Sequence, residues 1–169
     1  MPILTLVRHA KSSWKDTSLS DRDRPLNNRG KNSAPIMAER YLSRDLLPDL
    51  IISSPAQRAL TTARIIAVGI GYDGDNIIQD DSLYFDGSMA MRLVIQNQQE
   101  GCEHLMLVGH NPDMTNLLND LAGYITGNIP TCGIATLHTE TPWSNIETAH
   151  WRLLDYDYPK KSQQEPKLL

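Results

Sequence analysis

The stretch LTLVRHAKSSW, residues 4–14, begins as a buried strand and changes character within a single residue. Its first residues are mostly β-branched or aliphatic, a composition typical of a short strand inside a sheet. Arg8 and His9 follow at once, and a small polar loop comes after them. Ligands of open α/β sheets bind beyond the carboxyl ends of the strands. The stretch therefore predicts such a sheet, with Arg8 and His9 at its binding edge.

Strand and helix signals alternate outward from this stretch. Buried-strand patterns are predicted at residues 3–7, 49–54, 76–79, 104–109, 132–138 and 149–156. Apolar residues at helical spacing predict helices at residues 27–47, 54–70, 88–97 and 111–123. This β-α-β-α order, ending in a pair of strands, predicts a three-layer α/β/α domain. Its sheet is expected to have roughly six strands, mostly parallel, with one antiparallel strand at the edge.

Three of the predicted helices carry start signals, and their candidate N-cap residues are Asn27, Ser54 and Asn111. Ser54 is followed by Pro55 at the first helical position and by Gln57 three residues on, which together form a capping-box pattern. Pro112 follows Asn111 in the same way.

Length, composition and charge bound the class of protein. The chain has 169 residues, of which 40% are hydrophobic and 21% charged, values typical of one globular domain. We assign residues 1–157 to that domain and the polar residues 158–169, which show no periodicity, to a C-terminal tail. The net charge of −4 argues against a nucleic-acid surface.

Targeting, redox and metal signals are sparse. The first apolar run, residues 3–7, is too short for a signal peptide or a membrane span, so a cytoplasmic protein without a membrane partner is expected. Cys102 and Cys132 lack redox or zinc spacing and are predicted to be reduced thiols. No metal-ligand motif occurs, and we predict neither a metal nor a cofactor.

Basic and titratable side chains follow three of the predicted strands. Arg8 and His9 come after the first strand, Arg58 lies in the first turn of the helix after the second, and His110 comes directly after the fourth. Two helix N-termini with unpaired N–H groups are expected at the same edge. Arginine forks and helix N-termini both favour phosphate oxygens, so the predicted ligand is a phosphoryl group.

Each of these residues has a simpler explanation when taken alone, since a lone arginine is mostly solvated and a lone histidine is mostly a core or capping residue. Four of them at matching strand-helix junctions favour a site. Three other histidines lack such a placement and are interpreted as structural, namely His104, His138 and His150. No phosphate-binding glycine loop occurs, and neither cysteine has an arginine six residues later, which leaves histidine as the nucleophile.

Four motifs in chain order, LVRHAKSSW, RPLNNRG, SSPAQRALTTA and VGHNPDMTNLL, resemble those of the histidine phosphatase (phosphoglycerate mutase-like) superfamily. The short chain, the D-x-x-R-P-L pattern at residues 21–26 and the strand TCGIATL are most similar to its SixA-type phosphohistidine phosphatase branch. The resemblance covers residues 3–138 and implies a phosphoglycerate mutase-like fold.

The resemblance implies a role for each residue of the set. His9 is the expected nucleophile, Arg8 and Arg58 the clamps on the phosphoryl oxygens, and His110 the group that stabilises the phosphoryl in transit. A backbone hydrogen bond on one nitrogen of His9 is expected to fix its tautomer. Because they lie in the polar loop and at a helix start, Ser12 and Asn111 join the predicted substrate-binding residues.

Two positions depart from the family pattern. Ala10 stands where the family usually has glycine after the catalytic histidine, so a positive φ at this position would be strained. The second departure concerns the proton donor. Asp21 is the candidate from the D-x-x-R-P-L segment, and the loop after the third strand offers three alternatives, Asp80, Asp81 and Asp86.

The implied activity is hydrolysis of a phosphorylated substrate through phosphohistidine on His9, without a cofactor. Phosphohistidine on a protein domain is the preferred substrate, because a chain this short leaves little length for a lid over the site. Three alternatives stay open at this point: phosphatase action on a small metabolite, a non-catalytic phosphate-binding module and a metal-dependent hydrolase.

Overall fold

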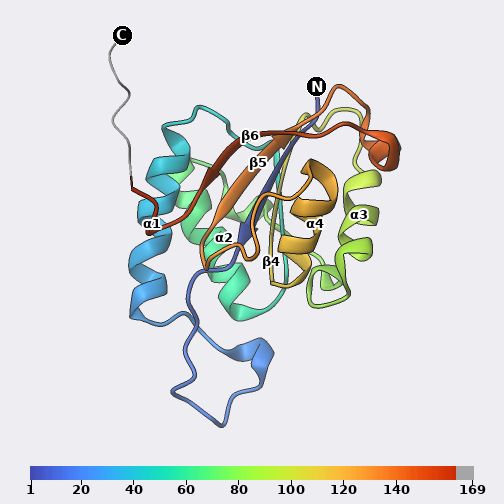
Figure 1. Ribbon diagram of the computed structural model, residues 1–169. Helices are drawn as coiled ribbons and strands as arrows, with labels where there is room; N and C mark the ends of the chain where they lie inside the picture. Colours follow the sequence, from blue (N-terminus) through green and yellow to red (C-terminus); the bar gives the residue numbers. More distant parts are fainter. Residues whose placement is uncertain (163–169) are drawn as a thin grey trace.

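Six strands form one central sheet in the computed structural model, which describes residues 1–162 (Figure 1). They are β1 (Ile3–Arg8), β2 (Leu50–Ser53), β3 (Ile78–Gln79), β4 (His104–Gly109), β5 (Ile134–His138) and β6 (Arg152–Asp157), in the spatial order β3-β2-β4-β1-β5-β6. Neighbouring strands from β3 to β1 are parallel, whereas β5 runs antiparallel to both β1 and β6. The predicted class is confirmed. The predicted place of the antiparallel strand is wrong, because β6 pairs with the outer side of β5 and itself forms the edge.

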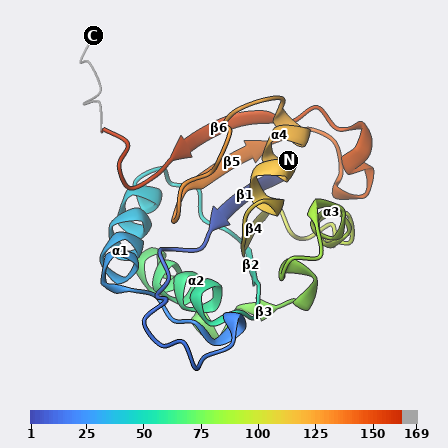
Figure 2. The same ribbon diagram turned by 60° about the horizontal axis from the view of Figure 1, so that its bottom comes forward.

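Helices cover both faces of the sheet. They are α1 (Asn28–Leu42), α2 (Gln57–Ile70), α3 (Ser88–Gln96) and α4 (Asp113–Ala122), joined by short 3₁₀ turns named η1 (Asp21–Asp23), η2 (Gly74–Asn76), η3 (Asp81–Leu83) and η4 (Trp143–Thr148). Figure 2 shows α1 and α2 on one side of the strands and α3 and α4 on the other. The predicted three layers follow from this arrangement.

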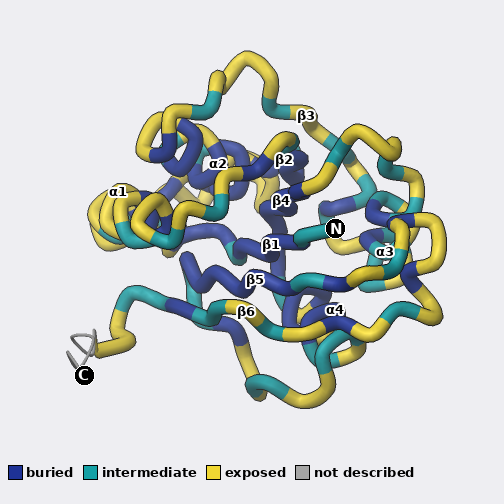
Figure 3. The backbone as a smooth tube through the Cα atoms, turned by 90° about the horizontal axis from the view of Figure 1, so that it is seen from above, coloured by how far each residue is buried: buried dark blue, intermediate teal, exposed yellow. Residues whose placement is uncertain are grey.

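Alternate residues of the central strands supply two separate cores. In β4, Met106 and Val108 pack towards α1 and α2, while Leu105 and Leu107 pack towards α3 and α4. All four are fully buried, and Figure 3 shows this strand within the dark blue centre of the molecule. Burying one such side chain contributes about 1.5–3 kcal/mol, so the two cores hold the strand ends in fixed positions.

Helix starts differ from the predictions at two places. Asn27 caps α1 as predicted, since its side chain accepts a hydrogen bond from the Gly30 amide at 2.9 Å. The predicted caps Ser54 and Asn111 are wrong, because α2 and α4 begin at Gln57 and Asp113. Both side chains make contacts beside the strand ends instead, as described below. The helix predicted to reach residue 47 ends at Leu42.

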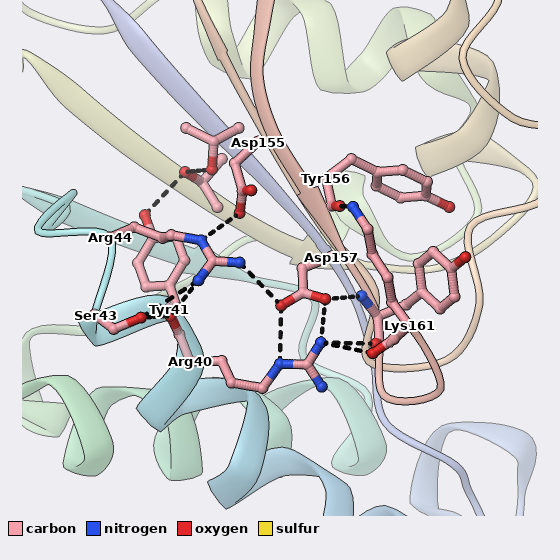
Figure 4. A network of polar contacts seen from close by, with 11 residues as sticks. Arg40, Tyr41, Ser43, Arg44, Asp155, Tyr156, Asp157 and Lys161 are labelled. Carbon is pink, nitrogen blue, oxygen red and sulfur yellow. Dashed lines mark hydrogen bonds and ion pairs between the residues drawn. The ribbon is translucent and has the colours of Figure 1, made fainter. Parts of the chain in front are cut away.

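A cluster of ion pairs joins the edge strand β6 to α1 (Figure 4). Arg40 pairs with Asp157 through two nitrogens. Arg44 reaches Asp155 at 3.1 Å and Asp157 at 3.3 Å. Asp157 is 3% exposed, so these arginines compensate a carboxylate that would otherwise be buried at a large energetic cost.

The predicted tail, residues 158–169, begins at this cluster. Arg40 donates a hydrogen bond to the Tyr158 carbonyl at 3.3 Å, and the Lys161 ammonium donates to the Tyr156 carbonyl. Residues 163–169 of the predicted tail lie outside the described residues.

A buried group of hydroxyls surrounds His104 at the amino end of β4. The Thr5 hydroxyl contacts His104 Nε2 at 2.8 Å, the Tyr41 hydroxyl at 3.0 Å and the Thr136 hydroxyl at 3.0 Å. This end of β4 is opposite to the end that carries His110. The structural interpretation of His104 agrees with this placement.

Candidate active site

The carboxyl ends of β1, β2 and β4 bring the four predicted residues to one edge of the sheet. Arg8 ends β1, His9 follows it, Arg58 is the second residue of α2, and His110 follows β4. The rings of His9 and His110 lie 5.1 Å apart between centroids. Both histidines and Arg58 are buried, with exposed fractions of 8%, 1% and 1% for His9, His110 and Arg58. The predicted convergence of these side chains is what the structure shows.

One ring nitrogen of His9 is held by the backbone. Nδ1 lies 2.7 Å from the Ala10 carbonyl oxygen, which can only accept, so Nδ1 carries the proton in the neutral ring. The tautomer that this contact assigns leaves a lone pair on Nε2. Burial and the nearby charges of Arg58, Arg8 and Arg24 lower the pKa of His9 to about 4, against the opposing effect of the Ala10 carbonyl. The ring is therefore neutral near pH 7.

Ala10 fits the loop without strain. The non-glycine residues with positive φ in the described chain are Asp45, Phe85 and Cys132, so Ala10 does not need the left-handed conformation. Its side chain is fully buried, and its amide donates to the Thr62 hydroxyl at 3.0 Å. A positive φ occurs instead at Cys132, in the turn before β5, and the Cys132 amide donates to the His9 carbonyl at 3.0 Å.

Ser54 orients His110. Its hydroxyl lies 2.7 Å from His110 Nε2 and accepts the Ala56 amide at 3.2 Å. Within the described residues the hydroxyl has no other acceptor, so we assign it as donor to Nε2, which places the ring proton on Nδ1. Burial, together with the neighbouring His9 and Arg58, lowers the pKa of His110 to about 3. The neutral ring thus presents an N–H donor through Nδ1.

Three buried nitrogens of the site lack a hydrogen-bond partner in the described structure. They are Arg8 Nε, Arg58 Nε and His110 Nδ1. Buried donors without partners cost roughly 1–3 kcal/mol each, and each of them calls for an explanation, such as a bound ion or a catalytic role. All three belong to residues predicted from the sequence, and all three are donors suited to an oxyanion.

Asn111 supports the site through a loop. Its amide nitrogen donates to the Ile129 carbonyl at 3.0 Å, and its oxygen accepts the Thr115 hydroxyl at 2.9 Å. The same Ile129 carbonyl accepts a hydrogen bond from Arg8 at 2.7 Å. Both ends of the Asn111 side-chain amide are thus used within the protein, where Asn111 shares the Ile129 carbonyl with Arg8.

Asp21 lies in the site, against the clamp arginine. Arg58 donates to its carboxylate at 2.9 Å and to its carbonyl at 2.6 Å, and the Tyr84 hydroxyl donates to the same carboxylate oxygen at 2.6 Å. Burial alone raises the pKa of Asp21. The bonds from Tyr84 and Arg58 and the charge of Arg58 outweigh that effect and lower the pKa to about 2. Asp21 is therefore ionised near pH 7 while Arg58 holds it.

The alternative carboxylates lie elsewhere in this region. Asp80 accepts the Ser82 amide at 2.9 Å and caps η3. Asp81 is 84% exposed and pairs with Arg22 at 3.2 Å. Asp86 is exposed and has no hydrogen bond or ion pair in the described structure. Among the four candidates, Asp21 is the carboxylate that contacts a predicted site residue.

Sequence reasoning assigned no role to Arg24, which lies between Asp21 and the polar loop. Its guanidinium donates to Asp21 at 3.1 Å and to the Ser12 hydroxyl at 2.9 Å, and it stacks 3.5 Å from the centroid of the Trp14 ring. The side chain is 8% exposed, and its charge contributes to the lowered pKa of His9. The D-x-x-R-P-L pattern was the signal that marks it. Ser12, a predicted substrate contact, lies beside the site and receives this bond.

Aromatic rings border His110, and sequence reasoning missed them as well. The Phe85 ring lies 4.6 Å from the His110 ring and the Tyr84 ring 5.4 Å from it. Phe85 has a φ of 61° and is 47% exposed. A bulky residue in the left-handed region is strained, and such strain gathers at functional sites.

The described residues contain neither a metal-binding cluster nor a membrane-spanning helix. No group of three or more histidine, cysteine, aspartate or glutamate side chains is arranged there to hold a metal ion. None of the described helices combines the length and apolar character of a bilayer-spanning segment.

Comparison with known proteins identifies the family. The model for the histidine phosphatase superfamily (branch 1) matches residues 4–84. A crystal structure from Agrobacterium tumefaciens, assigned as phosphohistidine phosphatase SixA, is 31% identical with a TM-score of 0.80, over 94% of this chain and 98% of that chain. A SixA structure complexed with tungstate has 18% identity and a TM-score of 0.75, over 93% and 97%, which shows the shared fold.

A curated relative adds to this picture. An uncharacterized chloroplastic protein of Arabidopsis thaliana is 33% identical over 142 residues, which are 79% of this chain. The chain spans 65% of that protein's length. Together with the full-length match to the Agrobacterium structure, these findings show that the chain belongs to the histidine phosphatase superfamily, in its SixA-type branch.

Proposed function

We propose that this protein hydrolyses phosphoryl groups through a covalent phosphohistidine intermediate on His9. The observation that carries the proposal is the contact between His9 Nδ1 and the Ala10 carbonyl at 2.7 Å. It commits the neutral ring to a lone pair on Nε2, beside two clamp arginines. A pKa lowered to about 4 keeps that lone pair available near pH 7.

The proposed reaction has two steps. In the first, the bond between His9 Nε2 and phosphorus forms while the bond from phosphorus to the leaving atom breaks, and the leaving atom takes up a proton. In the second, a water oxygen attacks phosphorus, the Nε2–phosphorus bond breaks, and inorganic phosphate leaves. Negative charge lies on the equatorial oxygens throughout, so Arg8, Arg58 and the Nδ1–H of His110 stabilise both transition states.

We propose Asp21 as the proton donor of the first step. A phosphoryl group that binds Arg58 competes with Asp21 for the same guanidinium and brings negative charge beside the carboxylate. Both changes raise the pKa of Asp21 from about 2, so the residue takes up a proton when substrate binds. Asp21→Asn is expected to slow an alkyl phosphate, which has a poor leaving group, more than an aryl phosphate. An equal loss for both would contradict the role.

The proposed substrate is phosphohistidine on a protein domain. Its support is the name and 31% identity of the Agrobacterium structure and the absence of a long insertion over the site in the described chain. A panel of substrates tests it. A histidine-phosphorylated protein domain is expected to be hydrolysed with a higher kcat/KM than sugar phosphates, and the reverse order would favour a small metabolite.

Labelling tests the covalent step itself. Incubation with a phosphodonor is expected to give an acid-labile phosphorylated chain, and His9→Ala is expected to abolish the label. Label that persists in His9→Ala would exclude His9 as nucleophile. Failure of the wild-type chain to take up label or release phosphate would favour a non-catalytic phosphate-binding module.

We further propose that the reaction needs neither a metal nor an organic cofactor, because Arg8, Arg58 and His110 each supply a buried donor without a partner in the described residues, and these can bind the phosphoryl oxygens. Full activity after treatment with EDTA is the expected result. Activity lost with EDTA and restored by a divalent ion would overturn this part of the proposal and favour a metal-dependent hydrolase.

The two free cysteines support a reducing compartment, and we propose the cytoplasm. Cys132 is buried and Cys102 is half-buried, and neither forms a disulfide. Disulfide-free cysteines are typical of the cytosol. Fractionation of cells with an antibody against the chain tests the location, and recovery outside the cytoplasm would contradict it.

A further inference from the structure

A cationic groove opens beside the candidate active site. It has a volume of about 740 Å³ and lies between the loop after β1 and the first turn of α1. Four exposed cations line it, namely Lys11, Lys15, Arg29 and Lys31, and no carboxylate is among its described lining residues. In Figure 1 this loop projects below the sheet, at the end where β1 delivers His9.

The groove is built rigidly, because its two walls are hydrogen-bonded to each other. The Asn27 amide donates to the Lys11 carbonyl at 3.0 Å, and the Ser13 amide donates to the Pro25 carbonyl at 2.8 Å. Gly30 of α1 faces the Lys11 backbone so closely that an added Cβ would lie 2.2 Å from its carbonyl oxygen. The cations therefore project from a preformed frame.

Trp14 adds an apolar surface to the groove. Its side chain is 71% exposed, whereas tryptophan is usually largely buried. Stacking on the Arg24 guanidinium at 3.5 Å fixes the ring. An exposed, rigid tryptophan flanked by cations is typical of the contact points of protein interfaces.

The groove is connected to the catalytic residues by direct contacts. Ser12 lines it, and the Ser12 hydroxyl accepts a bond from Arg24 at 2.9 Å. Arg24 also binds Asp21 at 3.1 Å, and Asp21 binds Arg58 at 2.9 Å. A molecule that places its phosphoryl group between the clamp arginines therefore has neighbouring parts within reach of the groove.

The charge of the groove is not neutralised by the protein. None of its four cations forms an ion pair in residues 1–162, although the whole chain has a net charge of −4. Two carboxylates of the same loop are engaged locally, because Asp16 accepts from Ser18 and Asp23 accepts from Ser20. The groove is thus a positive site on an otherwise acidic protein.

We infer that this groove docks an acidic segment of the protein that carries the phosphorylated histidine. The inference rests on the proposed function, because it assumes that the substrate is a protein. It goes further by assigning recognition to charges outside the phosphoryl site. Carboxylates beside the phosphohistidine pair with the rims of the groove, and an apolar side chain lies against Trp14.

A protein segment fits these observations better than a nucleic acid or a small anion. A nucleic-acid backbone carries one charge on every nucleotide and would be repelled by the net negative charge of the whole chain. A small polyphosphate has no apolar part to cover Trp14 and Pro25, which both line the groove. An acidic peptide offers both carboxylates for the four cations of the groove and an apolar side chain to cover Trp14.

Two phosphopeptides test the inference. Both carry one central phosphohistidine, flanked by glutamates in the first and by glutamines in the second. The wild type is expected to hydrolyse the glutamate peptide with a kcat/KM about tenfold higher at low salt, and the difference is expected to shrink as salt screens the charges. The double variant Arg29→Glu and Lys31→Glu is expected to lose this preference.

A matched variant controls for the change in net charge. Arg64 and Lys160 are exposed cations that do not line the groove. Arg64→Glu combined with Lys160→Glu is expected to keep the preference for the glutamate peptide. All three proteins are expected to hydrolyse p-nitrophenyl phosphate equally. Equal rates for both peptides in the wild type, or equal losses in both double variants, would overturn the inference.

Binding without phosphate separates docking from catalysis. Fluorescence anisotropy with the unphosphorylated glutamate peptide is expected to show binding by the wild type that Arg29→Glu and Lys31→Glu abolish. If this holds while no phosphopeptide is hydrolysed, the proposed function fails and the docking groove stands. If both phosphopeptides are hydrolysed equally and neither binds, the groove fails and the function stands. Tighter, groove-dependent binding of a single-stranded oligonucleotide would overturn the choice of partner.

Discussion

His104 and His110 lie at opposite ends of β4, and the two histidines share burial but differ in their hydrogen bonds. Both are buried, with exposed fractions of 4% and 1%, and burial is the main cause of lowered pKa values of about 4 and about 3. His104 Nε2 contacts hydroxyls of Thr5 and Tyr41 inside the sheet. His110 Nδ1 has no partner in the described residues, and the His110 ring lies 5.1 Å from the His9 ring between centroids. Burial and a lowered pKa are thus shared, and the unpaired donor is not.

The largest expected effect separates the two histidines by activity. His110→Ala removes a donor aimed at the phosphoryl oxygens, and kcat/KM is expected to fall about 1,000-fold. His104→Gln alters a side chain at the far end of β4, and kcat/KM is expected to stay close to the wild-type value. Steady-state kinetics with p-nitrophenyl phosphate measure both. A similar loss of activity in the two variants would remove the distinction.

The second effect separates them by stability in acid. Burial lowers the pKa of His104 from 6.5 to about 4. Between pH 6.5 and pH 4, His104 is therefore protonated in the unfolded chain but neutral in the folded chain. The stabilisation is present above pH 6.5 and is lost as the pH falls towards 4. The loss amounts to about 3 kcal/mol for this one residue. Urea unfolding at about pH 7 and about pH 4.5 measures it.

A variant of His104 shows how much of the stability lost in acid comes from this histidine. His9 and His110 also have lowered pKa values and add losses in the same pH range. His104→Gln is expected to lower stability near pH 7 and to make stability less dependent on pH. An unchanged pH dependence in His104→Gln would show that folding does not lower the pKa of His104.

The third effect compares the hydroxyl partners of the two rings. Ser54→Ala frees Nε2 of His110 and lets the ring choose the other tautomer, so kcat/KM is expected to fall about 30-fold, as for residues that orient a functional histidine. Ser54→Thr keeps the hydroxyl and is expected to restore most of the activity. Thr5→Val removes the partner of His104 and is expected to cost about 1–2 kcal/mol of stability with little change in kcat/KM. Loss of activity in Thr5→Val would contradict the comparison.

The sequence allowed the fold and the four central residues to be predicted, because both depend on local patterns. Strand and helix periodicity predicted the layers, and strand ends placed Arg8, His9, Arg58 and His110 at one edge. Ser54 was misassigned, since a serine before a proline has the local pattern of an N-cap. Its bond to His110 spans 56 positions, and no periodicity reports such a contact.

The loops were the least predictable part for the same reason. Asp21 reaches Arg58 across 37 positions, and Tyr84 reaches Asp21 across 63. These contacts depend on the paths of two irregular segments, and a single sequence carries no signal for such paths. The D-x-x-R-P-L pattern drew attention to Asp21 through family resemblance, whereas nothing in the local sequence predicted a positive φ at Phe85.

The smallest expected effect concerns that phenylalanine, which covers the His110 ring. Phe85→Gly relieves the strain of a φ of 61°, but it removes an aromatic contact 4.6 Å from His110. The two changes oppose each other, so stability is expected to stay within about 1 kcal/mol of the wild type. Water then reaches His110, whose pKa is expected to rise from about 3 towards 6.5.

Kinetics of Phe85→Gly against pH reveal this change. The kcat/KM is expected to fall about fivefold near pH 7, in line with the loss of one aromatic pair. In the wild type the profile of kcat/KM against pH is expected to inflect near pH 4, at the pKa of His9. In Phe85→Gly a second inflection is expected above pH 4, at the raised pKa of His110. Phe85→Tyr keeps both the ring and the strained backbone and is expected to match the wild type. If Phe85→Gly instead gives the wild-type pH profile, the ring does not shield His110. The low pKa of His110 would then follow from burial by the rest of the site and from the neighbouring His9 and Arg58.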